Sequence, residues 1–259
     1  MGIATSKESF RSARHSEPPP LTGKDGLRAL YKAEAIDGYR QQIELSSANR
    51  MARKTLKYAP AVHTVKREIP QAEAPWPSGQ VVWMDSDCDN NLPHTRPPNL
   101  ICLSKNIAQS SLESIVLHER VHVSQRLHSS EWAKLFRDYW SMDQWDGEIP
   151  ADILLRRRIN PDIIIAPLFI WKKNYVPLAL FNSLTMPDLH NVDIVWWHPS
   201  SRTLQRQSPP GWEDFFGTIH SGHEHPFEMS AYLVQNDSNN IKAYKAIKDK
   251  IKNFPYHSL

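Results

Sequence analysis

The chain has 259 residues, of which 40% are hydrophobic and nine are tryptophans, a composition that predicts a folded globular protein and excludes a disordered one. Its 31 basic and 28 acidic residues leave a net charge of +3, so we expect no nucleic-acid partner. Two cysteines cannot build a disulfide framework and favour a reducing, cytoplasmic compartment. The most apolar stretch, residues 163–171, is too short to cross a bilayer.

Residues 1–25 are predicted to form a disordered N-terminal segment, because they contain few apolar residues and the run "EPPPLTG". No apolar run of signal-peptide length occurs in the first thirty residues. The opening "MGIATSK" places Gly2 and Ser6 where N-myristoylation requires them. The motif is loose and also occurs by coincidence. One myristoyl chain gives only marginal binding, so we expect at most reversible contact with the cytoplasmic face of a membrane.

Residues 26–75 are predicted to be a helical N-terminal region of one long helix or two. Its candidate buried face consists of Leu27, Leu30, Tyr31, Ile43 and Met51. Residues 76–259 are predicted to form one domain, which begins with two short apolar segments that predict strands, residues 80–87 and 99–104.

The remaining pattern alternates between helices and hairpins. Further helices are predicted at residues 130–140 and 149–159, and the tail is helical with one apolar stripe (Ile241, Tyr244, Ile247, Ile251 and Phe254). Two β-hairpins, at residues 167–181 with a turn at Lys173–Asn174 and at residues 192–206, form an insertion over about residues 163–205. The mixture of helices and hairpins predicts the α+β class.

The stretch "LESIVLHERVHVSQRLH" contains His118, Glu119 and His122 in the order H-E-x-x-H. Ser110 and Glu113 ahead of it have the spacing of a capping box, which predicts that a helix begins there. Two histidines four residues apart lie on one helix face and can bind the same Zn²⁺, with the glutamate beside the metal as a general base. The alternative is an amphipathic helix that carries histidines by chance. The capped helix after a strand favours a zinc site.

The third ligand has two candidates. His128 has the spacing of the long H-E-x-x-H-x-x-G-x-x-H motif, but Gln125 stands where that motif needs glycine to leave the helix. A continuing helix would leave His128 as a surface histidine near the helix end. In "SGHEHPFEMSAY", Pro226 suits a first helical turn and places Glu228 and Tyr232 on one face. Glu228 is either the third ligand or an acid that stabilises a helix N-terminus, and we favour the ligand.

These motifs resemble those of the gluzincin metallopeptidases, and "HERVHVSQ" followed by "HPFEMSAY" is similar to little-characterised zincin-like proteins of bacteria and large DNA viruses. The likeness covers roughly residues 94–235 by motif and order only. It implies Zn²⁺ bound by His118, His122 and Glu228, with Glu119 as the base. It also implies an α+β zincin-like domain with an active-site helix and a preceding edge strand. Glu228 lies farther downstream than in familiar gluzincins, so the hairpins are expected to form an inserted subdomain.

The resemblance predicts a zinc-dependent peptidase that hydrolyses peptide bonds through a metal-activated water, with a protein or peptide as substrate. Tyr232 or His223 is the candidate donor to the oxyanion. Gln125 and Glu224 are candidates for orienting the imidazoles. The strand at residues 99–104, if it lies at the sheet edge, is a candidate for pairing with an extended substrate.

Two other functions remain open at the level of sequence. One is a non-enzymatic, zinc-stabilised protein of a membrane or a virion, and the other is a zinc peptidase that uses His128. An intact Glu119 favours an enzyme, because structural zinc needs no general base. Cys88 and Cys102 are expected to be small buried hydrophobic residues, not ligands.

Overall fold

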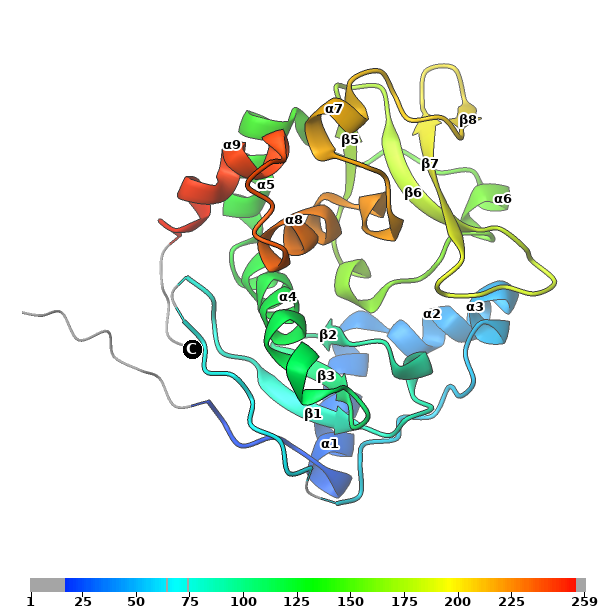
Figure 1. The fold of residues 1–259 in the computed structure, drawn as a ribbon. Coiled ribbons are helices and arrows are strands. Elements are labelled where there is room, and N and C mark those ends of the chain that lie inside the picture. The colour runs from blue at the N-terminus through cyan, green and yellow to red at the C-terminus, as the bar shows by residue number, and fades with distance from the viewer. Residues whose placement is uncertain (1–16, 64, 74, 255–259) are drawn as a thin grey trace, which may run out of the picture.

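A three-stranded sheet lies between helices in the lower half of the molecule (Figure 1). The computed structural model describes residues 17–63, 65–73 and 75–254. Strands β1 (Gln80–Met84), β3 (Leu100–Ser104) and β2 (His94–Arg96) are neighbours in that order, with β1 parallel and β2 antiparallel to β3. Helix and sheet are mixed along the chain, which confirms the predicted α+β class.

Both faces of this sheet are covered. Leu30 of α1 (Gly23–Asp37) packs in one cluster with Val82 and Cys102. On the opposite face, α4 (Gln109–Leu127) packs Val116 against Trp83. Every residue of β3 is therefore buried, which explains why its sequence is a continuous apolar run with no alternation.

The strand predicted at residues 99–104 exists as β3, but its predicted place at the sheet edge is wrong. β3 is the central strand, so its backbone is paired on both sides and cannot accept a substrate strand. The edge strands are β1 and β2, and on β2 the N–H of Thr95 already donates to Asp162 Oδ1 at 2.6 Å. Asp162 lies in the short 3₁₀ helix η2 (Pro161–Ile163), which covers this edge.

The predicted N-terminal helical region, residues 26–75, is helical only in its first half, where it forms α1, α2 (Tyr39–Leu45) and α3 (Ser47–Met51), and its described residues after Ala52 form no helix. Gly38 ends α1 with a φ of 58°, a conformation that glycine adopts without strain. The predicted buried face is correct for Leu30 and Ile43 but wrong for Tyr31 and Met51, which are 60% and 53% exposed. Tyr31 follows Leu30 in α1 and so points to a different side of that helix, whereas Met51 belongs to a separate helix with its own orientation.

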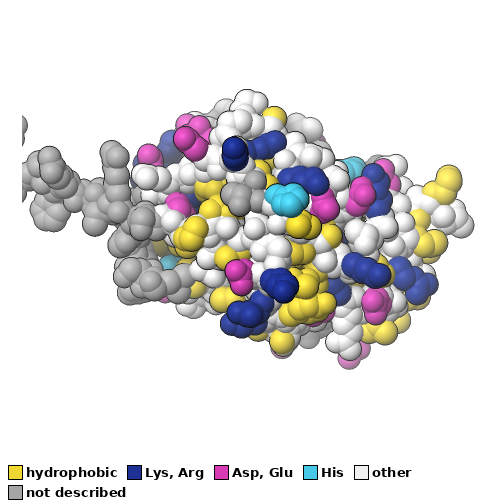
Figure 2. Space-filling model, turned by 90° about the horizontal axis from the view of Figure 1, so that it is seen from below, with side chains coloured by type: hydrophobic (Ala, Val, Ile, Leu, Met, Phe, Trp, Pro, Cys, Tyr) yellow, Lys and Arg dark blue, Asp and Glu magenta, His cyan; other side chains and the backbone are white. Residues whose placement is uncertain are grey.

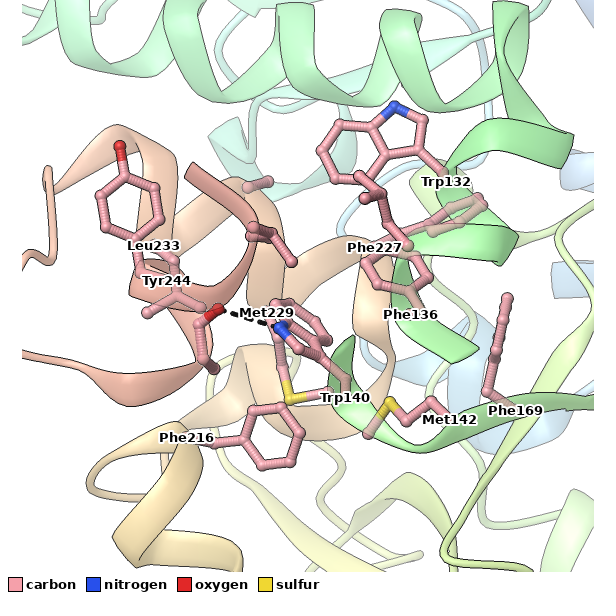
Figure 3. Packing of buried hydrophobic residues seen from close by; sticks show 14 of the residues in the cluster. Trp132, Phe136, Trp140, Met142, Phe169, Phe216, Phe227, Met229, Leu233 and Tyr244 are labelled. Atoms are coloured by element: carbon pink, nitrogen blue, oxygen red, sulfur yellow. Dashed lines mark hydrogen bonds between the residues drawn. The ribbon is translucent and has the colours of Figure 1, made fainter. Parts of the chain in front are cut away.

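The C-terminal half is built around an aromatic core (Figure 3). It joins α5 (Ser129–Trp140), α7 (Trp212–Phe216), α8 (Pro226–Gln235) and α9 (Lys242–Ile251). The indole of Trp140 donates to the carbonyl of Ala243 at 2.9 Å, a hydrogen bond drawn in Figure 3 that fastens α9 to α5. The predicted tail helix and its apolar stripe are confirmed, with Tyr244, Ile247 and Ile251 buried.

The predicted hairpins are confirmed in part. β7 (Val192–His198) and β8 (Thr203–Gln205) form the second hairpin, beside β6 (Val176–Phe181). In the first, the chain turns at Lys172 and Lys173, both with positive φ, but β5 (Leu168–Trp171) pairs with β4 (Met142–Trp145) instead of β6. Only the bridge between Trp171 and Tyr175 joins the two arms. The helix predicted at residues 149–159 is only the single turn α6 (Ala151–Leu154). The remaining elements are the 3₁₀ helices η1 (Asp89–Asn91) and η3 (Ser221–Glu224).

The surface and the N-terminus bear on membrane contact. In the part of the chain that the structure describes, no helix has both the length and the hydropathy needed to span a bilayer. The face seen from below carries acidic side chains among the basic ones, in keeping with the small net charge (Figure 2). The acylation predicted at Gly2 and the disorder predicted for residues 1–16 fall outside the described residues. The disorder predicted for residues 17–25 is wrong, because Leu21 forms a β-bridge with Val82 and α1 begins at Gly23.

Candidate metal centre

Helix α4 carries the H-E-x-x-H residues on its cleft side. It begins at Gln109 with Ala108 as N-cap, so Ser110 lies inside the first turn and the predicted capping box does not form. The helix runs without a break through Gln125 to Leu127, as its sequence predicted. His118 and His122 therefore lie one turn apart, with ring centroids at 4.8 Å and the two Nε2 atoms at 3.1 Å.

Glu228 reaches the same point from α8. Pro226 occupies the first turn, and the N-cap His225 accepts a hydrogen bond from the N–H of Phe227, so the chain enters the helix in a fixed direction. Glu228 Oε2 lies 3.6 Å from Nε2 of His118, and Oε1 lies 3.5 Å from Nε2 of His122. The three buried side chains offer ligand atoms within 4.8 Å of one another, so together they could hold a metal ion.

The hydrogen bonds behind His122 fix which of its nitrogens faces this group. Gln125 Nε2 donates at 2.9 Å to the carbonyl of Phe227, which can only accept, so the amide oxygen of Gln125 faces Nδ1 of His122, at 2.8 Å. Nδ1 therefore carries the hydrogen, and the lone pair of Nε2 faces His118 and Glu228. On His118, Nδ1 lies 3.0 Å from the amide oxygen of Gln235 and Nε2 again faces the centre.

Two imidazole lone pairs 3.1 Å apart repel unless a cation lies between them, either a proton or a metal ion. Burial alone lowers the pKa of both imidazoles. On His118 the hydrogen bond and the charge of Glu228 outweigh burial, and the net shift of its pKa is upward. The pKa of Glu228 is in turn held well below its usual value, first by the charge of His122 and then by His118, although burial opposes this. The group is thus built to bind positive charge, and its donors fit a transition metal.

Glu119 lies beside this group with an unused oxygen. Its side chain is 3% exposed, and Oε2 has no hydrogen-bond partner among the described residues. Burial first, and then the carboxylates of Asp162 and Glu228, raise the pKa of Glu119 well above its usual value, while Arg126 opposes them. A buried carboxylate with a raised pKa is suited to taking up a proton.

Asn160 and Glu224 hold Glu228 in place. Asn160 Nδ2 donates to Glu228 Oε1 at 2.8 Å and to Glu224 Oε1 at 2.9 Å, and Arg158 pairs with Glu224 at 2.5 Å. The prediction that Gln125 orients an imidazole is confirmed. Glu224 instead contacts the candidate ligand Glu228 through Asn160, a contact that sequence spacing gives no means to foresee.

Tyr232 and His223 have different surroundings. The ring of Tyr232 packs edge-on against His118 at 4.7 Å and lines the cleft, and burial raises its pKa to about 12. Gly222 packs against the same ring, where any side chain would collide with it. His223, by contrast, is buried, and its Nδ1 accepts from the indole of Trp212 at 2.9 Å. A second histidine, His220, also packs on Tyr232, with the ring centroids 4.8 Å apart, and the sequence analysis missed it.

His128 follows the last residue of α4 and is not part of the metal-binding group found among the described residues. The prediction of a surface histidine is wrong, because His128 is only 9% exposed and packs beside Phe254. Cys88 and Cys102 are buried and free, as predicted, and burial raises the pKa of Cys88 to about 12, so that thiol stays neutral.

A cleft of about 320 Å³ gives access to the centre. His118, Glu119, Glu228 and Tyr232 line it together with a second polar cluster from the N-terminal half (Tyr39, Arg53, Asp89 and His94). Comparison of the chain with models of protein families, with curated protein sequences and with solved structures found no match. The assignment below therefore rests on geometry and chemistry.

Proposed function

We propose that the protein is a zinc-dependent peptidase of the gluzincin kind. The observation that carries the proposal is the buried convergence of His118, His122 and Glu228 beside the unpartnered oxygen of Glu119. Two imidazoles and one carboxylate are the protein ligands of several zinc hydrolases, and this set leaves a coordination position for water or substrate. A structural zinc site takes four protein ligands, so a three-ligand centre that opens on a cleft favours catalysis over the non-enzymatic alternative.

Zinc in this centre would act as a Lewis acid on a scissile carbonyl and lower the pKa of water. Glu119 takes the proton from the attacking water and delivers it to the leaving amine. Tyr232 is the candidate donor to the oxyanion, because it lines the cleft next to His118. His223 is not proposed for this role, because its ring is held by Trp212.

Metal content and peptide hydrolysis of wild type and Glu119→Gln test the proposal. We expect about one zinc per chain in both proteins, with hydrolysis reduced by several orders of magnitude in the variant, because only the base is removed. Elemental analysis also distinguishes zinc from iron, which binds similar sets of two histidines and one carboxylate. Equal hydrolysis by the two proteins, or iron in place of zinc, would refute the proposal.

A further inference from the structure

His94, at the start of β2, is buried with one ring nitrogen unused. Its side chain is 3% exposed, and Nδ1 lies 3.1 Å from the carbonyl of Leu92. A carbonyl only accepts, so Nδ1 carries the hydrogen and Nε2 is left with a lone pair. Nε2 is buried and has no hydrogen-bond partner among the described residues. A buried acceptor without a donor destabilises the fold, and a ligand that donates a hydrogen bond to this nitrogen would remove that cost.

The residue that carries this buried nitrogen lines the cleft of the metal centre. His94 and Asp89 line that cleft together with His118 and Glu119. Nε2 of His94 is 3.8 Å from Oδ2 of Asp89. Since a hydrogen bond is about 2.9 Å long, one donor atom can reach both acceptors at once.

The charges around this pair restrict the donor. Asp89 is bonded to Arg40 at 2.6 Å and lies 3.7 Å from Arg53, so two guanidinium groups already exceed its single negative charge. An ammonium group would be repelled by them. Burial lowers the pKa of His94, although Asp89 opposes this, and the imidazole stays neutral. An anion would meet two acceptors and is disfavoured as well. A neutral N–H or O–H is the donor that fits.

We propose that His94 and Asp89 form a subsite that selects peptide substrates with a hydroxyl or primary amide side chain. This inference rests on the proposed peptidase function, because it identifies the ligand as a substrate side chain. A site that is built to hydrogen-bond a substrate group discriminates strongly against an isostere that lacks the group, since its own polar atoms are then left unpaired.

Binding to the zinc-loaded Glu119→Gln protein tests the subsite without turnover. The peptides are made in pairs that differ at one position, Thr against Val or Asn against Leu, and the position is moved along the peptide. The affinity of each peptide is measured by calorimetry. At one position we expect the Thr and Asn peptides to bind about tenfold or more tightly than their isosteres. Equal affinities within every pair would overturn the inference.

Two leucine variants locate the effect. In Glu119→Gln, the added change His94→Leu should abolish the preference, while His190→Leu, at an exposed residue of the same cleft, should keep it. A preference that survives His94→Leu would overturn the assignment. The peptide affinities measured on Glu119→Gln, in which His94 is unaltered, do not depend on whether the His94→Leu protein folds. If wild type binds with this preference but hydrolyses no peptide, the subsite stands and the peptidase fails. If it hydrolyses peptides without preference, only the subsite fails.

Discussion

The amide oxygen of Gln125 lies 2.8 Å from Nδ1 of His122, three residues earlier on the same helix. The other end of this amide donates to the carbonyl of Phe227 and to the hydroxyl of Ser230, both on α8. One side chain therefore fixes the tautomer of a candidate metal ligand and also joins the two helices that supply the candidate ligands. Such partners raise the basicity of the imidazole and hold its orientation.

Replacing Gln125 with Leu should weaken zinc binding about tenfold to a hundredfold, because His122 loses the partner that orients it. Zinc affinity measured by competition with a chelator checks this. Gln144→Leu, at an exposed position in β4, is the matched control and should leave affinity unchanged. An unchanged affinity in Gln125→Leu would show that packing alone orients the imidazole.

Local periodicity accounts for what the sequence predicted well. His118 and His122 share one face because of helical geometry, and Pro226 indicated the helix that presents Glu228. Gln125 at the position of glycine correctly predicted that the helix continues. These features depend on neighbouring residues, so a single sequence suffices to infer them.

Features that depend on packing between distant segments were missed or mistaken. Asn160 contacts Glu228 only because η2 folds over the edge of β2, and His220 reaches Tyr232 only through the η3 turn. The prediction that β3 is an edge strand was wrong, because a buried apolar run does not show how many strands pair with it. The capping box failed because Ala108, not Ser110, is the N-cap.

Tyr232→Phe should retain zinc and slow turnover by about 10²-fold to 10³-fold, the effect of removing one donor to an oxyanion. The ring remains, so its packing against His118 is kept. Measured kcat and zinc content, with the exposed Tyr31→Phe as control, check the prediction. A kcat equal to that of wild type would exclude the hydroxyl from catalysis.

His225 should make the metal-free protein sensitive to acid. Burial lowers its pKa to about 3, and only the neutral ring can both accept from Phe227 N–H and donate to the carbonyl of Pro167. The unfolded chain binds a proton near pH 6.5, while the folded chain does not until about pH 3. The contribution of neutral His225 to the free energy of unfolding is therefore complete above pH 6.5. It is lost as pH falls below that value, by about 1.4 kcal/mol per pH unit.

Denaturant unfolding between pH 7 and pH 5 in the presence of a chelator measures this slope. His225→Asn supplies a capping side chain that does not titrate, so its stability should fall less steeply with acid than that of wild type. Identical slopes would mean that His225 does not remain neutral in the folded protein.

The most direct test of the account is a comparison of zinc affinity in wild type, Glu228→Ala and His128→Ala. Both altered residues are buried, so circular dichroism must first show that each variant folds. With His118, His122 and Glu228 as the ligands, Glu228→Ala should lose zinc affinity by orders of magnitude, and His128→Ala should bind one zinc per chain as tightly as wild type. Zinc lost in His128→Ala and retained in Glu228→Ala would contradict the assignment.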